Sequence, residues 1–266
     1  MRYSNLHTHT TYSDGKHSPE ENVLSAIEKN MLSLGFSDHS FTSNDSSYCM
    51  PELHYPEYLQ TISNLKQIYG SKIDIYAGLE MDYYTEVSDL PFDYLIASVH
   101  YIIKNEVNYP IDHSPEQQLD CIQNAFHDDI LAMAQCYYDM LCEHVERIHP
   151  TYVGHFDVIT KFGLMPEDDA CYRAIAGKAL RRILKTCPYI EINTGAIARG
   201  LRKTPYPADY LLQILLDEGG KPVLGSDSHD KHNLVFAFDQ TVNLLKTIGF
   251  KHIYRFNGRG FDSCEI

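Results

Sequence analysis

Short apolar runs alternate with longer amphipathic segments along this chain, and this alternation constrains the fold more than any other sequence feature. Seven runs are predicted strands, with a further candidate at His252–Phe256: Tyr3–His9, Ser33–Ser37, Ile73–Gly78, Tyr94–Val99, Tyr152–His155, Tyr189–Asn193 and Lys221–Gly225. The predicted helices are Pro19–Asn30, Tyr55–Tyr69, an interrupted Pro115–Ile148, Asp168–Thr186, Pro207–Glu218 and Leu234–Ile248. Strands that alternate with helices form parallel sheets, because each helix returns the chain to the start of the next strand.

The number of strand–helix units then favours one architecture. A chain of 266 residues could hold two small domains or one barrel. Seven or eight units fit a closed β/α barrel better than an open doubly wound sheet. No repeat or linker divides the chain, so we expect one α/β domain over residues 1–266. The segment 104–150 is too long for a simple crossover, and we expect a helical insertion there that lies over the barrel mouth.

Composition excludes several classes of function. The net charge of −14 argues against a broad nucleic-acid-binding surface. The seven cysteines are scattered without a Cys-x-x-Cys pair, which indicates reduced thiols and neither a disulfide framework nor a thiolate zinc site. No apolar run is long enough to span a bilayer, and the N-terminus lacks a signal-peptide pattern. We therefore expect a cytoplasmic protein.

Histidines and acids recur where the predicted strands end. His7 and His9 stand two apart in an extended segment, so their side chains point to the same face, and Asp14 follows in a turn. In a barrel, the carboxyl ends of the strands converge on one face, where catalytic groups are generally found. Nine residues qualify by position: His7, His9, Asp14, His39, Glu80, His100, His155, Asp227 and His229.

This donor set predicts a metal centre. Imidazole and carboxylate ligands without thiolates suit divalent zinc, manganese or iron. A catalytic ion takes about three protein ligands, so nine ligands predict two or three ions, with Glu80 or Asp227 as a bridge. Any one of these histidines alone could be a hydrogen-bonded structural residue; their shared placement favours the metal. His17 is a further candidate, as a substitute ligand or proton donor. Asp38 and Asp157 are candidates to orient imidazoles, and Asp157 could equally be a helix cap.

These residues also carry a family resemblance. The blocks occur in the order typical of the polymerase-and-histidinol-phosphatase (PHP) superfamily, and together they cover nearly the whole chain: His7-Thr8-His9-Thr10-Thr11-Tyr12-Ser13-Asp14-Gly15, Ser37-Asp38-His39, Gly78-Leu79-Glu80, Ser98-Val99-His100, Gly154-His155 and Ser226-Asp227-Ser228-His229. The resemblance implies a distorted seven-stranded barrel. It also implies a metal-dependent phosphomonoester hydrolase, in which Glu80 and Asp227 belong to the catalytic centre.

Further stretches resemble the histidinol-phosphatase branch: Glu191-Ile192-Asn193-Thr194 followed by Gly200-Leu201-Arg202-Lys203-Thr204, Gly154-His155 followed by Lys161-Phe162-Gly163, and Gly78-Leu79-Glu80-Met81-Asp82-Tyr83. The branch implies hydrolysis of L-histidinol phosphate to L-histidinol and phosphate in histidine biosynthesis. It implies phosphate binding by Arg202 and Lys203, with Lys161 and Arg199 as further candidates. Family members join the two elements more closely, and residues 195–199 intervene here, so Arg199 and Arg202 compete for the role.

Phosphate chemistry agrees with this expectation. A phosphate monoester carries nearly two negative charges at neutral pH, and an acidic protein needs a local positive centre to bind it. The expected partner is a small phosphate ester, with neither nucleic acid nor membrane. Tyr83, Tyr101 and Tyr206 are candidates for the organic part of the substrate. Two alternatives remain: a PHP phosphoesterase for another small ester or a nucleotide, and a non-catalytic metal-binding module. No pattern in the sequence predicts an oligomeric state.

Overall fold

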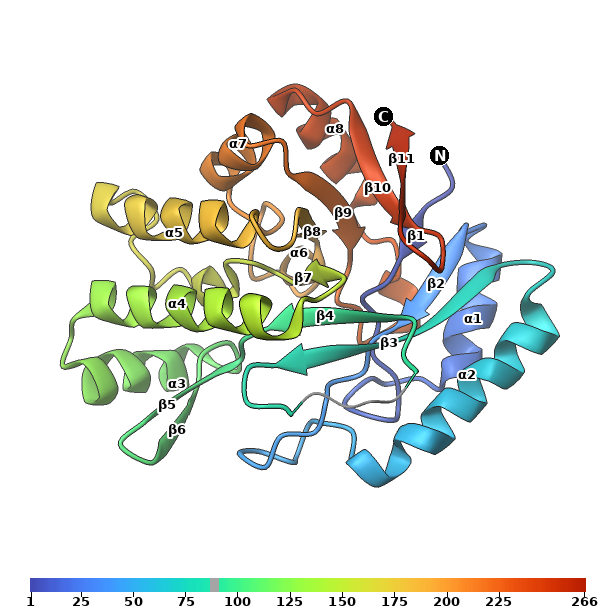
Figure 1. The fold of residues 1–266 in the computed structure, drawn as a ribbon, viewed down its shortest axis with the longest axis horizontal. Helices are drawn as coiled ribbons and strands as arrows, with labels where there is room; N and C mark the ends of the chain where they lie inside the picture. The colour runs from blue at the N-terminus through green and yellow to red at the C-terminus, as the bar shows by residue number, and fades with distance from the viewer. Residues whose placement is uncertain (87–90) are drawn as a thin grey trace.

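Seven parallel strands form a nearly closed barrel in the computed structural model of the chain, which describes residues 1–86 and 91–266 (Figure 1). In sheet order they are β1 (Ser4–Asn5), β2 (Ser33–Phe36), β3 (Asp74–Asp82), β4 (Tyr94–Ser98), β7 (Tyr152–Val153), β8 (Tyr189–Asn193) and β9 (Lys221–Gly225). The first and last strands meet where Thr8 and Ser228 form a parallel bridge. The predicted barrel and its seven strands are confirmed.

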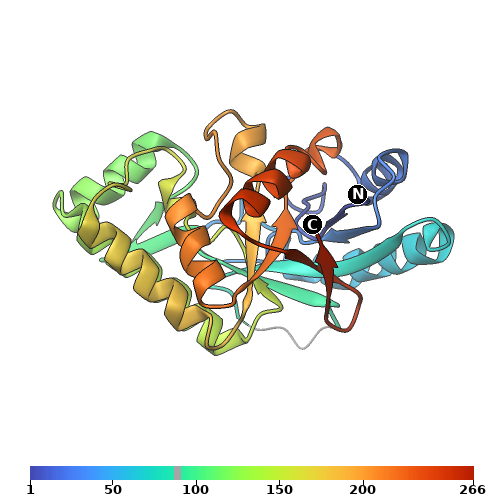
Figure 2. The same ribbon diagram turned by 90° about the horizontal axis from the view of Figure 1, so that it is seen from above.

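Helices surround the strands in chain order, as Figures 1 and 2 show from two directions. The longer ones are α1 (Pro19–Glu28), α2 (Tyr55–Tyr69), α4 (Ile130–Ile148), α5 (Ala170–Ile183), α7 (Asp209–Asp217) and α8 (Phe238–Ile248). Short pieces connect them: α3 (Pro115–Asp120), the π-helical turn η2 (Cys121–Ala125), α6 (Gly195–Ala198), and the 3₁₀ turns η1 (Glu52–His54), η3 (Val158–Thr160) and η4 (Lys231–Asn233). Helix α1 begins where Ser18 and Glu21 form a capping box.

Strand lengths differ from the prediction for a geometric reason. The first half of β3 pairs with β2 and its second half pairs with β4, so β3 must be long enough to join two staggered neighbours. It therefore runs on to Asp82, and Glu80 lies within the strand instead of just past its end. The predicted strands Tyr3–His9 and Tyr152–His155 shrink to two residues each, because the chain leaves the sheet where it presents its histidines.

The segment 104–150 completes a hairpin and then supplies helices. Strands β5 (Tyr101–Lys104) and β6 (Val107–Pro110) form the hairpin, which the sequence analysis did not predict. Its two turn residues, Asn105 and Glu106, have φ values of 52° and 64°, as tight hairpin turns require. Helix α4 then packs against α5 and β4, in the position of a barrel crossover helix.

The candidate strand His252–Phe256 does form, as β10, but it lies outside the barrel. It pairs antiparallel with β11 (Phe261–Glu265), and this hairpin packs beside β9 (Figure 1). Within the described part of the chain, no helix combines the length and apolar character needed to cross a bilayer.

An apolar cluster fills the barrel interior on the side of Glu80 that faces the amino ends of the strands. It consists of Leu6, Tyr94, Ile96, Tyr152 and Phe256, all buried. The hydroxyl of Tyr94 donates to the carbonyl oxygens of Leu6 and Phe36, which ties β4 to the carboxyl ends of β1 and β2 across the barrel interior. A Cβ atom at Gly78 would lie 2.3 Å from the Tyr94 ring, so glycine is needed there for the ring to fit. The functional groups therefore lie beyond this sealed end.

Candidate metal centre

Glu80 lies at the middle of the carboxyl-end cluster and is buried. Its Oε1 lies 2.9 Å from His155 Nε2 and 3.4 Å from His100 Nε2. Its Oε2 lies 3.2 Å from His7 Nε2 and 3.0 Å from His39 Nδ1. The two oxygens therefore face different pairs of imidazoles, which is the arrangement a bridging carboxylate needs.

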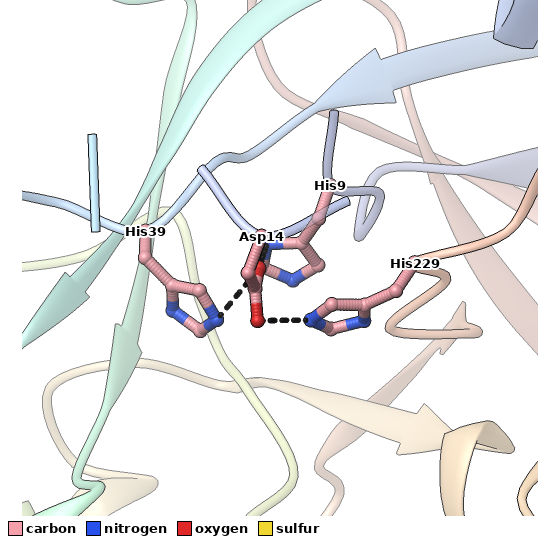
Figure 3. A group of neighbouring side chains, drawn as sticks. All are labelled: His9, Asp14, His39 and His229. Carbon is pink, nitrogen blue, oxygen red and sulfur yellow. Dashed lines mark ion pairs between the residues drawn. The ribbon is translucent and has the colours of Figure 1, made fainter. Parts of the chain in front are cut away.

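A second group consists of His9, Asp14, His39 and His229, which Figure 3 shows. It lies nearer the surface, since Asp14 is exposed and His229 is half-buried. The Asp14 carboxylate points between three imidazoles: its Oδ2 is 3.2 Å from His229 Nε2, and its Oδ1 is 3.7 Å from His39 Nε2. His9 lies between the other two rings, with centroid separations of 4.3 Å to His39 and 4.1 Å to His229. Because His9 and His39 also approach Glu80, this outer group adjoins the inner one.

Asp227 completes the centre from the loop after β9. Its Oδ1 lies 3.1 Å from His9 Nε2 and 3.7 Å from His7 Nε2. Its backbone has a φ of 45°, in the left-handed region that aspartate tolerates better than most residues. Such conformations persist where the surrounding structure holds them, often at functional sites.

The structure brings all nine predicted residues into overlapping groups of ligand atoms. The four groups are His9–Asp14–His39–His229, His7–Glu80–His155, His7–His9–Asp227 and His39–Glu80–His100, and in each of them the atoms lie within 4.8 Å of one another. The sharing of His7, His9, His39 and Glu80 between groups is the pattern expected of neighbouring ions with common ligands.

Unpartnered buried atoms show that this centre fits cations. His7 Nε2, both ring nitrogens of His9 and Glu80 Oε2 are buried without a hydrogen-bond partner among the described residues. Each such atom would cost about 1–3 kcal/mol if it stayed unsatisfied. Divalent ions would satisfy all four at once, and the imidazole–carboxylate donor set suits them. The residues therefore fit a multinuclear metal centre.

The electrostatics of two of these residues, Glu80 and His9, agree with that fit. Burial alone would raise the pKa of Glu80, but the imidazoles of His7, His39 and His100 hold it well below its usual value. Burial lowers the pKa of His9 to about 3, assisted by His229 and His39. Glu80 is thus held as a carboxylate and His9 as a neutral imidazole, which are the protonation states that bind metal ions.

Two carboxylates that the sequence analysis did not assign to the centre orient its imidazoles. Glu191 Oε1 lies 2.7 Å from His7 Nδ1, and Asp82 Oδ2 lies 3.2 Å from His100 Nδ1. Each therefore contacts the ring nitrogen that faces away from Glu80, which fixes the ring and its tautomer. Glu191 sits so close to β9 that a Cβ at Gly225 would lie 1.8 Å from its Oε1. An acid inside the apolar run Tyr189–Asn193 was the available signal.

The expectation that Asp38 and Asp157 orient imidazoles is wrong. Asp38 accepts hydrogen bonds from the backbone N–H of Thr10 and the hydroxyl of Ser13, so it braces the loop that carries His9 and Asp14. Asp157 accepts from the backbone N–H of Ala208 instead. Asp38 is the immediate neighbour of His39, and neighbouring side chains point in different directions in extended chain. Asp157 lies two residues beyond His155, in a turn that leads into η3.

A cavity of about 540 Å³ opens beside the centre, and only some of the candidate phosphate-binding residues line it. Arg199 and Lys161 line it. Arg199 Nη2 donates to Asp227 Oδ2 at 2.7 Å, and Lys161 Nζ lies 3.1 Å from Asp112 Oδ2. Arg202 instead donates to Thr160 and pairs with Glu167 at 3.3 Å, and neither it nor Lys203 is among the described residues of the lining.

His17 does not join the nine-residue cluster. Its Nε2 lies 3.4 Å from Asp230 Oδ1, and its ring faces His232 at a centroid distance of 6.0 Å. It also lies outside the described lining of the cavity. The geometry therefore gives no support to His17 as a substitute ligand of this centre or as a proton donor to a group bound in the cavity.

Aromatic and acidic side chains line another part of the cavity. Tyr48 packs edge-on against His39 and stacks on Tyr101, and the Tyr101 hydroxyl donates to Asp45 at 2.8 Å. Asp112 lies in the same lining. Of the three tyrosines singled out from the sequence, only Tyr101 is there: Tyr83 donates to Glu143, and Tyr206 is buried against Arg202.

Comparison with known proteins places this site in a family. Residues 5–195 match the family model described as PHP domain. A probable histidinol-phosphatase of Schizosaccharomyces pombe is 28% identical over 86% of this chain and 81% of its own length. The histidinol-phosphatase of Lactococcus lactis is 28% identical over 98% of this chain and 97% of its own.

A solved structure shares the fold. It is the Lactococcus lactis histidinol phosphate phosphatase complexed with zinc, L-histidinol and phosphate; the TM-score is 0.74 at 24% sequence identity, over 98% of this chain and 99% of that one. The family match covers well over half of the sequence and includes most of the residues that converge on Glu80. The chain therefore belongs to the PHP domain family.

Proposed function

We propose that this protein hydrolyses L-histidinol phosphate to L-histidinol and phosphate. The observation that carries the proposal is the convergence of nine ligand-type side chains around Glu80 beside a cavity that also presents Arg199 and Lys161. Relatives named histidinol-phosphatases match 80–98% of the chain, and one solved relative was complexed with zinc, L-histidinol and phosphate.

The nine residues would hold two or three divalent ions of zinc, manganese or iron. When bound, such ions act as Lewis acids on a phosphoryl group, activate water and offset the charge of the transition state. Glu80 would join two of the positions, because its oxygens face different pairs of imidazoles. Glu191 and Asp82 would keep His7 and His100 in the tautomers that bind a cation.

Arg199 would bind the phosphate. Its Nη2 and Nη1 contact the carboxylate and backbone oxygens of Asp227, so the guanidinium is held against the centre. The remaining donors of its planar fork suit phosphate oxygens. Lys161 lines the same cavity and would add a positive charge to the phosphate site, once its ammonium group leaves Asp112.

The tyrosine and aspartate part of the cavity suits a cationic organic group. Histidinol phosphate carries an amine and an imidazole, which carboxylates and aromatic faces both bind. Asp45, Asp112, Tyr48 and Tyr101 provide those groups. A simple aryl phosphate has no cation to place there, so it should be the poorer substrate.

Phosphate release from L-histidinol phosphate and from p-nitrophenyl phosphate tests the assignment. The protein should first be loaded separately with zinc, manganese and iron, and its metal content measured. We expect a higher kcat/KM for histidinol phosphate by at least about tenfold, the effect of one charge-assisted hydrogen bond. Equal values would mean a phosphoesterase of other specificity, and bound metal without turnover under any loading would mean a binding module.

Paired substitutions test which arginine binds the phosphate. Arg199→Ala should raise KM for histidinol phosphate by about 10- to 100-fold, because a hydrogen bond to a charged group contributes about 1.5–3 kcal/mol. Arg202→Ala should leave KM nearly unchanged and lower the stability of the fold, since Arg202 pairs with Glu167. The reverse result would return the phosphate role to Arg202.

We also propose that residues 1–266 act as one phosphatase domain in the cytoplasm. All seven cysteines are free, which suits a reducing compartment.

A further inference from the structure

Two imidazoles and a carboxylate meet at a place separate from the nine-residue centre. They are His17, Asp230 and His232, and their ligand atoms lie within 4.8 Å of one another. We propose that these three side chains form a second, independent binding site for a divalent transition-metal ion at the rim of the cavity.

The two segments that carry these residues are held together before any ion binds. The backbone N–H of Lys16 donates to the carbonyl of His229 at 2.9 Å, and the hydroxyl of Ser25 in α1 donates to the carbonyl of Lys231 at 2.8 Å. Asp230 is fixed as the cap of η4, since its Oδ1 accepts from the backbone N–H of His232 at 3.0 Å. The site is therefore pre-organised by contacts that do not depend on the metal.

The distances are close to those of a bound ion. His17 Nε2 lies 3.4 Å from Asp230 Oδ1, and the His17 and His232 rings are nearly perpendicular, at 87°. Tetrahedral ligands at about 2 Å from zinc lie about 3.4 Å from one another. The His17–Asp230 pair already has that separation. The ligand atom of the exposed His232 lies within 4.8 Å of the other two, so an inward movement of this ring would complete the set.

The surrounding charges leave room for a cation. Lys16 Nζ lies 3.4 Å from Asp230 Oδ2, but its side chain is 68% exposed, and such pairs contribute about 0–1 kcal/mol. Lys231 is directed away, toward Glu21 Oε1 at 2.9 Å. The same Glu21 oxygen lies 3.6 Å from His17 Nδ1, where a carboxylate supports a metal-binding imidazole. An ion can therefore displace Lys16 and still keep Glu21.

The donor set defines the class of ion. Two imidazoles and one carboxylate favour zinc, cobalt, nickel or copper over magnesium and calcium, which prefer oxygen ligands. Water would complete the coordination, since His17 and Asp230 are 21% and 24% exposed. Asp230 and Lys16 both line the cavity. A metal ion at this rim site would therefore hold the loop that carries Asp230 in a fixed position beside the cavity.

Zinc titration of the holoprotein tests the proposal. The buried centre is filled first, and zinc bound per chain is then measured by equilibrium dialysis with elemental analysis. We expect one further, weaker zinc ion per chain. His232→Gln and His17→Gln should each lower the affinity for that ion by at least about tenfold, because the loss of even an outer partner of a metal site costs that much. His252→Gln removes an exposed histidine on β10 and serves as the matched control.

A second measurement reports the location of the ion. Amide hydrogen exchange at residues 229–236 should slow when zinc is added to the wild type, and this change should disappear in His232→Gln. The proposal is overturned if the wild type binds no further ion, or if His232→Gln and His252→Gln bind zinc equally well. Neither readout uses turnover of a phosphate ester, so the result is independent of the proposed phosphatase activity.

Discussion

The two ends of the barrel are built from the same strands but contain opposite chemistry. Toward the amino ends, Tyr94 and Tyr152 fill the interior and pack with Phe256 of the β10–β11 hairpin, which lies beside β9. At the carboxyl ends, buried imidazoles and carboxylates converge, several of them without hydrogen-bond partners among the described residues. One end gains stability by excluding water, while the other retains buried polar groups that bound cations would satisfy.

This contrast teaches where stability and function reside. Apolar packing at the sealed end requires no ligand, so it can hold the strands in register by itself. Because the strands are held in place there, the side chains at the polar end have fixed positions, as a metal centre requires. Strand β3 contributes to both, with Gly78 against the Tyr94 ring and Glu80 among the imidazoles only two residues later. The expected effects of substitutions should divide in the same way.

The largest effect is expected at the polar end. Glu80→Gln keeps the shape of the side chain but removes the charge that bridges two pairs of imidazoles. We expect loss of bound metal and a decrease in kcat/KM of at least about 1,000-fold, beyond the 10- to 100-fold cost of losing an outer partner. Elemental analysis, phosphate release and circular dichroism would measure metal, activity and fold. Glu106→Gln, on the exposed hairpin turn, is the control; full activity of Glu80→Gln would remove Glu80 from the centre.

A substitution at the sealed end should separate stability from metal binding. Phe256→Ala would leave a cavity against Tyr76, Tyr94 and Phe261. We expect the free energy of unfolding to fall by about 3 kcal/mol, with metal content unchanged. Urea unfolding at fixed metal concentration measures this, and Ile68→Ala, exposed on α2, should cost far less. Loss of metal from folded Phe256→Ala protein would show that the two ends are coupled.

A smaller effect is expected at Glu191, which contacts the proposed ligand His7 at the ring nitrogen that faces away from Glu80. Glu191→Gln keeps the side-chain volume beside Gly225 but weakens the hold on His7 Nδ1. Zinc affinity or kcat/KM should fall by about 10- to 100-fold. Competition with a chelator of known zinc affinity would measure the first quantity. Glu218→Gln, in an exposed ion pair with Arg181, should change neither; equal behaviour of the two variants would assign Glu191 to packing alone.

Elements with regular local patterns were the most predictable. Strands β8 and β9 and helix α2 have the predicted ends, because apolar runs, turns and caps determine them locally. The extension of β3 to Asp82 follows from pairing with two different neighbours, and no local pattern contains that information. The β5–β6 hairpin was missed for a related reason: its strands are short and lie outside the barrel.

The amino-acid sequence by itself determined the barrel and the nine residues at its carboxyl ends, because strand periodicity fixes which side chains share a face and which end of the sheet they occupy. Only the tertiary structure decided which groups support them. Glu191 and Asp82 contact the imidazoles of His7 and His100. Arg199 lines the cavity, whereas Arg202 does not. His17 lies beside Asp230, outside the nine-residue centre. Contacts between segments far apart in the chain depend on the packing of whole elements, which local patterns do not encode.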